Sequence, residues 1–111
     1  MTFKQKDIIL ISFPFSNQNG TKVRPGLIIS NNEFNLSSDD CLIVPLTSVL
    51  KNVKYSLTIE ENDLESGKLI KKSRIRIDKI TSIEKSLIKM KIGELNQKTF
   101  ENIKKELDSL F

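Results

Sequence analysis

The sequence contains no histidine, no tryptophan and a single cysteine, Cys41, among its 111 residues. Without histidine the chain cannot form a serine–histidine or cysteine–histidine catalytic pair, and a lone cysteine cannot hold zinc by itself. One cysteine also excludes an intramolecular disulfide, and its place inside the apolar segment CLIVPL predicts a buried side chain rather than a nucleophile. If the protein is an enzyme, its arginine, carboxylate and hydroxyl groups must therefore carry the chemistry.

Long hydrophobic runs are also missing. The apolar run at residues 8–11 is far shorter than the roughly 20 residues that a membrane-spanning helix requires, and the first residues lack the pattern of a secretory signal. We therefore expect a cytoplasmic protein with no membrane partner. Apolar residues make up 38% of the chain and charged residues 29%, as in ordinary globular proteins, and the length suits a single core. We expect one domain that spans residues 1–111.

Short apolar segments rich in β-branched residues dominate the first half of the chain. Three of them are bounded by turn-forming residues and predict core strands: IILISF (8–13), GLIIS (26–30) and CLIVPL (41–46). Apolar residues that alternate with polar ones predict further strands around residues 55–59, 75–77 and 88–92. This spacing predicts a small antiparallel barrel or sandwich of about six strands.

Polar segments at residues 14–25 and 31–40 are predicted to connect the first three strands. The first contains a turn-forming cluster at residues 16–21, which we interpret as a loop able to cover a site. The apolar period changes after Asn96, which is suited to cap a helix. A helical stripe follows, made of Phe100, Ile103, Leu107 and Leu110. The sequence therefore predicts a C-terminal helix packed on the sheet.

The net charge is only +4, but the charges are unevenly distributed. An acidic run contains Glu60, Glu61, Asp63 and Glu65. A basic run follows, opposed only by Asp78, and contains Lys68, Lys71, Lys72, Arg74, Arg76 and Lys79. The acidic run is either a solubilising turn or a Mg²⁺ site of a metal-dependent nuclease. Because metal ligands normally converge from rigid elements, we favour the turn and expect neither a metal nor a cofactor.

Alternation along the strand near residues 75–77 places Arg76 and Asp78 side by side on an outward surface, together with Arg74. This pair has two interpretations. It is a solvent-exposed ion pair at an edge strand, or it is an anion site in which Arg76 binds phosphate and Asp78 accepts a proton.

Polar side chains also stand at the ends of the predicted core strands. Arg24 and Pro25 precede GLIIS, so Arg24 is either a solvated strand end or a cation held for an anionic partner. Thr47 and Ser48 end the third strand, where their hydroxyl groups either satisfy the turn backbone or bind a phosphate. Ser30 ends the second strand with the same two interpretations.

In this order and spacing, the segments KVRPGLIIS, CLIVPLTS, SRIRIDKITSIEKS and IGELNQKTF resemble the MazF/PemK/Kid family of type II toxin–antitoxin toxins. The resemblance runs from about residue 6 to the C-terminus. It implies a twisted antiparallel SH3-like barrel with a C-terminal helix, assembled as a homodimer. Most members of the family are metal-independent endoribonucleases that cut single-stranded RNA and stop translation. The resemblance also implies a cognate antitoxin, with a flexible and often acidic segment that blocks the site.

By this resemblance Arg24 matches the active-site arginine of the family and Thr47 its active-site threonine. In the Kid-like branch an arginine and an aspartate two residues apart also serve catalysis, and Arg76 and Asp78 match those positions. That branch uses a histidine in the first loop as well, which this chain lacks.

Cleavage of RNA without a metal uses the neighbouring 2′-hydroxyl as nucleophile and leaves a 2′,3′-cyclic phosphate and a 5′-hydroxyl. We expect Arg24 to stabilise the transition state, with proton donation as a second role open to it, and Thr47 to hydrogen-bond the same phosphate. Asp78 is expected to act as the base, and Arg76 to bind phosphate or lower the pKa of Asp78. Further contacts with RNA are expected from Lys22, Ser30, Ser48, Lys71, Lys72 and Arg74. Phe15 and Tyr55 are the aromatic candidates for base stacking, although Tyr55 also suits a buried position.

Two other functions stay open at this point. A non-catalytic barrel would bind nucleic acid in a salt-dependent manner without cutting it. A gyrase inhibitor is the other alternative, because the CcdB toxins have a related fold. Their activity depends on a C-terminal tryptophan, whereas this chain ends in Ser-Leu-Phe.

Overall fold

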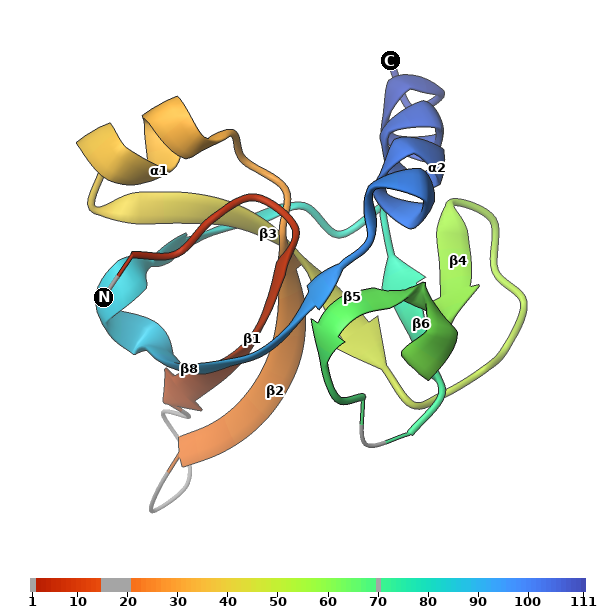
Figure 1. Ribbon diagram of the computed structural model, residues 1–111, viewed down its shortest axis with the longest axis horizontal. Coiled ribbons are helices and arrows are strands. Elements are labelled where there is room, and N and C mark those ends of the chain that lie inside the picture. The colour runs from red at the N-terminus through yellow and green to blue at the C-terminus, as the bar shows by residue number, and fades with distance from the viewer. Residues whose placement is uncertain (1, 15–20, 70) are drawn as a thin grey trace.

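The computed structural model describes residues 2–14, 21–69 and 71–111, which form a curled antiparallel sheet with a helix packed against it (Figure 1). The strands are β1 (Asp7–Pro14), β2 (Thr21–Ile28), β3 (Asp40–Thr47), β4 (Ser56–Ile59), β5 (Leu64–Gly67), β6 (Ser73–Arg76), β7 (Thr81–Glu84) and β8 (Ile88–Leu95). The helices are α1 (Asn32–Ser37) and α2 (Gln97–Asp108), with short 3₁₀ turns η1 (Glu61–Asp63) and η2 (Lys85–Leu87).

The strand order is β4-β6-β3-β2-β1-β8-β5, and β7 pairs with β3 outside that path. The pairings among the described strands are antiparallel. The mainly-β fold with a C-terminal helix is thus confirmed, with eight strands among the described residues in place of about six. The extra strands, β5 and β7, escaped prediction because β7 buries only Ile83 and β5 buries no residue fully.

Strand β2 begins at Thr21 rather than at the predicted Gly26, so Arg24 belongs to the strand and not to a loop. The reason is the pairing with β1, which extends to Pro14 opposite Thr21. Pro25 is tolerated because the pairing of β2 with β3 ends at Gly26 opposite Pro45. Beyond that pair, the missing N–H of Pro25 costs no bond to β3.

On the edge of β3 that faces away from β2, the partner strand changes near Pro45. Residues 40–43 pair with β7, whereas Leu46 and Thr47 pair with β6. Proline cannot donate a hydrogen bond to a neighbouring strand, so a switch between two partners is a position where it does little harm. The switch carries the end of β3, and with it Thr47, to the side of β6.

Two segments predicted to be irregular contain regular structure. The connection at residues 31–40 includes α1, whose first turn is capped by the Asn31 side chain, which accepts a hydrogen bond of 2.8 Å from the Phe34 N–H. The acidic run forms η1 and part of β5 rather than a plain turn, because Glu60 and Asp63 form a reciprocal capping box around η1.

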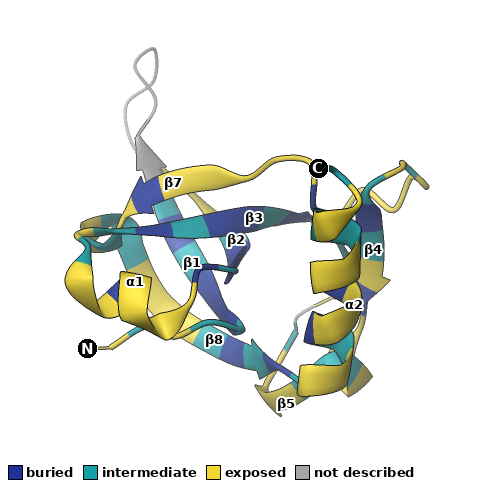
Figure 2. Ribbon diagram, turned by 90° about the horizontal axis from the view of Figure 1, so that it is seen from above, coloured by how far each residue is buried: buried dark blue, intermediate teal, exposed yellow. Residues whose placement is uncertain are grey.

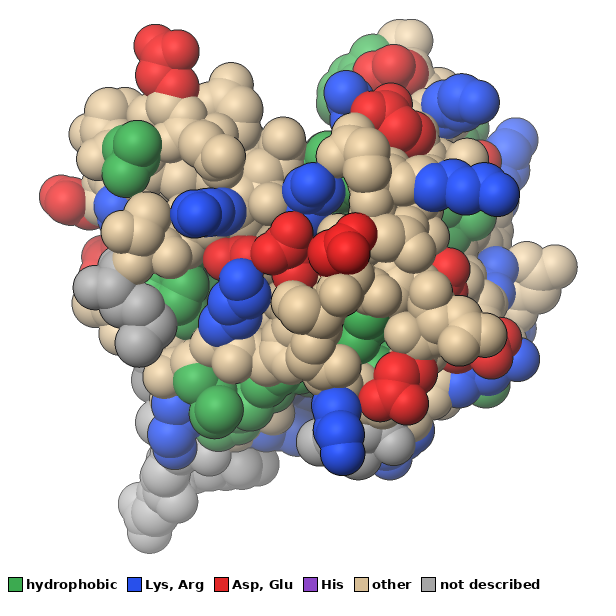
Figure 3. Space-filling view, in the orientation of Figure 1, with side chains coloured by type: hydrophobic (Ala, Val, Ile, Leu, Met, Phe, Trp, Pro, Cys, Tyr) green, Lys and Arg blue, Asp and Glu red, His purple; other side chains and the backbone are tan. Residues whose placement is uncertain are grey.

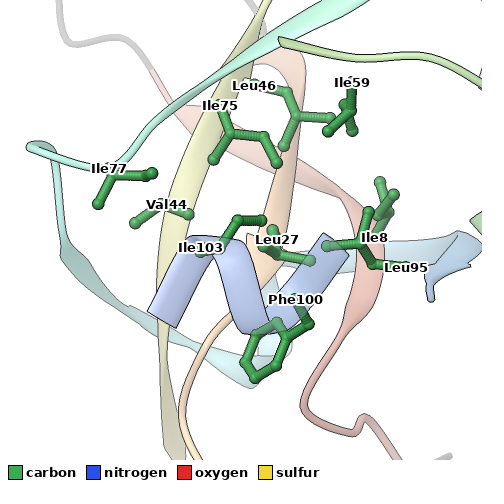
Figure 4. Packing of buried hydrophobic residues seen from close by; sticks show 10 residues of the cluster. All are labelled: Ile8, Leu27, Val44, Leu46, Ile59, Ile75, Ile77, Leu95, Phe100 and Ile103. Carbon is green, nitrogen blue, oxygen red and sulfur yellow. The ribbon is translucent and has the colours of Figure 1, made fainter. Parts of the chain in front are cut away.

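Buried apolar side chains form two clusters, one for each set of alternate residues along the central strands. Ile8 and Leu27 belong to the larger cluster, whereas Ile9 and Ile28 belong to the smaller one, as expected for strands with a period of two. Figure 4 shows the larger cluster, which contains Ile8, Leu27, Val44, Leu46, Ile59, Ile75, Ile77, Leu95, Phe100 and Ile103. Cys41 lies in the smaller cluster and is fully buried, which confirms the prediction from its sequence context.

Helix α2 packs on the larger cluster, and buried and exposed residues alternate along it (Figure 2). Phe100 and Ile103 are buried, and Leu107 and Leu110 pack against the same cluster, so the predicted stripe is confirmed. The Asn96 side chain caps the helix by accepting a 2.8 Å hydrogen bond from the Thr99 N–H. In the described part of the chain, no helix is long and apolar enough to cross a membrane.

Candidate functional site

Arg24 and Thr47 come together at the ends of two neighbouring strands. The paired register of β2 with β3 ends with Gly26 opposite Pro45, and Arg24 and Thr47 each lie two residues beyond that pair on their own strand. Two adjoining cavities share the wall that these residues form with Leu46 and Val49. Sheet register, and not proximity in sequence, therefore creates the site.

The first cavity, of about 370 Å³, is lined by four cationic side chains: Arg24, Lys51, Arg76 and Lys79. Its other lining residues are Pro45, Leu46, Thr47, Val49 and Val53, so none of the described lining residues is acidic. The face drawn in Figure 3 mixes acidic and basic side chains at neighbouring positions, in keeping with the modest net charge. The cavity is therefore a local concentration of positive charge, which favours a phosphate group. We call it the cationic cavity.

The second cavity, of about 350 Å³, is mostly apolar. Its lining residues are Leu10, Lys22, Val23, Arg24, Pro25, Leu46, Thr47, Ser48, Val49, Leu69, Lys71, Ser73 and Ile92. Val49, in the wall that both cavities share, is 65% exposed. A single exposed apolar side chain is common on protein surfaces, and only a group of them usually marks a contact surface. This apolar cavity offers a place for a planar ring or an apolar side chain directly beside a phosphate in the cationic cavity.

Thr47 has a contact that the turn interpretation predicts. Its Oγ1 accepts a hydrogen bond of 3.1 Å from the Val49 N–H, which stabilises the turn after β3. In the described part of the chain the same hydroxyl donates to no other group. Its proton is therefore available to an oxygen of a bound phosphate, and the two interpretations are compatible.

Arg76 lines the cationic cavity and holds Asp78 by two hydrogen bonds. Nε donates to Oδ1 at 3.0 Å, and Nη2 donates to Oδ2 at 2.9 Å. These bonds lower the pKa of Asp78 below its ordinary value and raise the pKa of Arg76. The pair arises across a turn, because β6 ends at Arg76 and the Lys79 N–H bonds the Arg76 carbonyl at 3.2 Å. The predicted continuation of the strand through Asp78 was therefore wrong, although the predicted neighbours are in contact.

A sequence profile described as the PemK-like, MazF-like toxin of type II toxin–antitoxin systems matches residues 4–111. The chain belongs to this toxin family. The match confirms the resemblance that the ordered segments had indicated. Comparison with curated protein sequences gave no match.

Solved structures of other toxins have the same fold at low sequence identity. An endoribonuclease in complex with its cognate antitoxin from a mycobacterial species is 19% identical, with a TM-score of 0.76 over 97% of this chain and 93% of that one. The MazE–MazF structure from Deinococcus radiodurans is 19% identical, with a TM-score of 0.80 over 99% and 96%. Mycobacterium tuberculosis toxin MazF-mt6 is 15% identical, with a TM-score of 0.71 over 91% and 93%.

The other expected RNA contacts of this toxin, apart from Ser30, fall into two groups. Lys22, Ser48 and Lys71 line the apolar cavity, next to Arg24 and Thr47. Lys72 is exposed but lines neither cavity, and Arg74 uses its guanidinium for contacts within the protein.

Ser30 lies away from both cavities. It is buried, its hydroxyl donates to Asn35 Oδ1, and its Oγ accepts from the Leu42 N–H at 3.0 Å. These contacts fit its role in the turn after β2, and we leave it out of the proposed site.

Two cations of the cationic cavity were not assigned to the site from sequence. Lys79 was noticed only as part of the basic run, and Lys51 lies in the irregular segment between β3 and β4, where no apolar period indicates which way a side chain points. Of the aromatic candidates, Tyr55 is half-buried with a positive φ of 63°. Phe15 and residues 16–20 of the predicted covering loop at 16–21 lie outside the described residues, whereas Thr21 begins β2.

The acidic run has structural contacts of its own. Asp63 Oδ2 accepts from the Glu60 N–H at 2.9 Å, and Asp63 Oδ1 accepts from the Thr99 hydroxyl at 3.0 Å. Across residues 2–14, 21–69 and 71–111, no group of three or more His, Cys, Asp or Glu side chains is arranged to hold a metal ion.

Proposed function

We propose that this toxin is a sequence-specific endoribonuclease that cleaves single-stranded RNA without a metal ion and thereby inhibits translation and growth. The observation that carries the proposal is the position of Arg24 and Thr47 in the wall between a cationic and an apolar cavity. That arrangement suits a nucleotide, which has a charged phosphate and an apolar ring face. The description of the mycobacterial relative as an endoribonuclease supports it.

The reaction that fits these side chains is internal transfer of the phosphate. The 2′-oxygen of a ribose attacks the adjacent phosphorus, and the bond from phosphorus to the 5′-oxygen breaks. The 2′-hydroxyl proton passes to a base, and the departing 5′-oxygen takes up a proton. The products are a 2′,3′-cyclic phosphate and a 5′-hydroxyl end.

Arg24 and Thr47 stabilise the charge that develops on the phosphoryl oxygens. The Arg24 guanidinium is permanently charged and planar, so it can donate two parallel hydrogen bonds to one phosphate. The Thr47 hydroxyl donates a further bond while its oxygen still accepts from the Val49 N–H. Pairing with β1 and β6 fixes the backbone of Arg24 and Thr47 before RNA binds, which limits where their side-chain donors can lie.

Asp78 accepts the proton of the 2′-hydroxyl. Its lowered pKa means that it is ionised, and therefore able to accept, at neutral pH. A phosphate in the cationic cavity competes for the Arg76 guanidinium and weakens its hydrogen bonds to Asp78. The pKa of Asp78 then rises toward its ordinary value, which makes the carboxylate a stronger base when substrate is bound.

The proposed partner of the toxin is an antitoxin whose flexible acidic segment lies over both cavities. Such a segment would pair its carboxylates with the four cations and place apolar side chains in the apolar cavity. The solved mycobacterial and Deinococcus relatives were determined with an antitoxin. We also propose that the toxin is a homodimer that acts in the cytoplasm, which light scattering and cell fractionation would test.

Fragment-end analysis tests the proposed reaction. The purified protein, Arg24→Ala and the control Lys89→Ala are incubated with a long unstructured RNA in excess EDTA. Lys89 is exposed on β8 and lines neither cavity. We expect discrete fragments with 2′,3′-cyclic phosphate ends from the wild type and from Lys89→Ala, and none from Arg24→Ala. RNA that is bound but never cut would contradict the endoribonuclease proposal and favour a non-catalytic RNA-binding module.

A further inference from the structure

Arg74 is the most extensively hydrogen-bonded cation in the described part of the chain. It lies in the middle of β6, opposite Thr47 on β3 and opposite Thr58 on β4. Nε donates to Ser56 Oγ at 2.7 Å, Nη1 donates to Thr58 Oγ1, and Nη2 donates to Asn52 Oδ1 at 2.8 Å. Each of the three guanidinium nitrogens therefore has an acceptor.

The acceptors of Arg74 are all uncharged. Among the described residues no carboxylate lies within ion-pair distance of it, in contrast to Arg76, which is paired with Asp78. A network that only needed to neutralise a cation would use a carboxylate, because a charged acceptor binds a guanidinium more strongly than a hydroxyl or an amide does. The contacts of Arg74 orient the guanidinium and fix its neighbours, and they leave its charge uncompensated.

Two of these contacts hold the irregular segment at residues 48–55, the yellow-green stretch that runs from the end of β3 to β4 on the right of Figure 1. Asn52 belongs to that segment and is bound directly. Ser56 accepts from Arg74 and donates its own hydroxyl proton to the Val53 carbonyl, so it relays a second connection. The segment is thus connected to Arg74 directly at Asn52 and, through Ser56 of β4, at Val53.

The same segment supplies part of the cationic cavity. Lys51 and Val53 line the cavity, and each is adjacent in sequence to Asn52, the residue that Arg74 binds. We infer that Arg74 is a positioning residue that fixes segment 48–55 and so holds Lys51 and Val53 in the wall of the cationic cavity. Arg74 itself lines neither cavity, so its effect on a ligand is transmitted through this segment.

This inference differs from a role for Arg74 as one more positive charge along the path of RNA. A lysine at position 74 would keep the charge, but its single ammonium group cannot reproduce three bonds in a planar fork. Arg74→Lys should therefore behave like Arg74→Ala if positioning matters and like the wild type if charge alone matters. Lys72→Ala is the matched control for the RNA-free test below, since Lys72 is a nearby exposed cation that lines neither cavity.

The first test needs no RNA and no catalytic activity. Lys51 and Lys54 are exposed in an irregular segment, and endoproteinase Lys-C should cut after them faster when the segment leaves its folded position, so a change in the cutting rate reports a change in local opening. We expect cutting at these sites to be about tenfold faster in Arg74→Ala, in Arg74→Lys and in Asn52→Ala, and unchanged in Lys72→Ala. Unchanged cutting in all three site variants would overturn the inference. Asn52→Ala keeps the test valid if the Arg74 variants fail to fold.

The second test uses RNA and rests on the proposed function. Affinity is measured for a labelled single-stranded oligonucleotide with 2′-O-methyl riboses, which cannot supply the nucleophile. Arg74→Lys and Lys51→Ala should each weaken binding about three- to tenfold, and the double variant should be no weaker than the more affected single variant. In cleavage assays Arg74→Lys should raise KM with kcat nearly unchanged. Two outcomes would show that Arg74 does not act through Lys51. One is a loss of affinity in the double variant equal to the product of the two single losses, and the other is full affinity in Arg74→Lys.

The two tests distinguish failure of the positioning role of Arg74 from failure of the proposed ribonuclease function. If the wild type neither binds nor cuts RNA, the proposed function fails, while the Lys-C experiment still decides whether Arg74 holds the segment. If RNA is cut normally and the Lys-C rates of the variants match the wild type, the positioning role fails and the ribonuclease proposal stands.

Discussion

Arg76 and Asp78 form a two-bond ion pair at the edge of the cationic cavity, with donor–acceptor distances of 3.0 and 2.9 Å. Only the arginine lines the cavity, and Asp78 lies in the turn after β6 with its side chain 32% exposed. Under the proposed function the pair has two arrangements, of which the structure contains the first. In one, Arg76 is committed to Asp78, and in the other a phosphate takes over part of its hydrogen-bonding capacity.

The pKa of Asp78 should depend on what occupies the cationic cavity. In the free protein the bonds from Arg76 favour the ionised carboxylate, so Asp78 should stay ionised as the pH falls through its ordinary value of 3.8 and become protonated only below it. Binding of the 2′-O-methyl oligonucleotide, or the change Arg76→Gln, should raise this pKa. A carboxyl ¹³C NMR titration measures it, with the Asp78 signal assigned by its loss in Asp78→Asn. A pKa that is unaffected by the oligonucleotide would separate Arg76 from phosphate binding.

Thr47 should matter through its hydroxyl proton. We expect Thr47→Val to lower the single-turnover cleavage rate at saturating RNA about 10²-fold, as loss of a donor to developing oxyanion charge does in other enzymes. Thr47→Ser keeps both the donor and the acceptor for the Val49 N–H, so it should retain most of the rate. Urea unfolding of Thr47→Val measures the structural part, which we expect to be about 1 kcal/mol. Full activity in Thr47→Val would leave the hydroxyl with its turn role alone.

Asp7 is a buried carboxylate whose charge is compensated by a surface lysine. The side chain of Asp7 is 1% exposed and that of Lys91 is 39% exposed, and Lys91 Nζ lies 3.0 Å from Asp7 Oδ1. That oxygen has no other partner among the described residues. We expect Lys91→Met to lower the free energy of unfolding by about 1–3 kcal/mol at pH 7, because it leaves a buried charge unpaired. Lys89→Met, on the same strand, should change it little in the same urea titrations.

The contribution of Lys91 should disappear at high pH. Its hydrogen bond to Asp7 raises the pKa of Lys91 above the ordinary value of 10.5. A raised pKa in the folded state stabilises the protein fully below the ordinary value, and this stabilisation is lost as the pH rises through the folded pKa. The stability difference between wild type and Lys91→Met should therefore be constant near neutral pH and shrink above pH 10.5. A difference that stayed the same there would mean that Lys91 acts by packing.

Cys41 should be chemically inert in the folded protein. It is fully buried in the smaller cluster, and burial raises the pKa of its thiol to about 11. At pH 8 the reactive thiolate form of Cys41 is therefore rare, and the side chain is inaccessible. Labelling of the native protein by a thiol reagent such as DTNB should be at least about 10²-fold slower than labelling of the urea-unfolded protein. Fast labelling of the native protein would show that the cluster around Cys41 opens readily.

Much of the architecture could be predicted from local patterns. The alternating and continuous apolar segments indicated the central strands, and the stripe after Asn96 indicated α2, because each pattern reports which side of a segment is buried. Strands β5 and β7 could not be found this way, since segments with little buried surface have no such pattern. Helix α1 was missed because it buries only Asn35 and depends on the cap at Asn31.

The sequence by itself determined the fold class, the buried state of Cys41, the family and the identity of the side chains with suitable chemistry. Only the tertiary structure decided where those side chains lie. The register of β2 with β3 brings Arg24 to Thr47, a turn joins Arg76 to Asp78, and Arg74 ties the segment of Lys51 to the sheet. The physical reason is that apolar periodicity encodes the burial of each segment, whereas a charged cavity depends on how separate segments are aligned against one another.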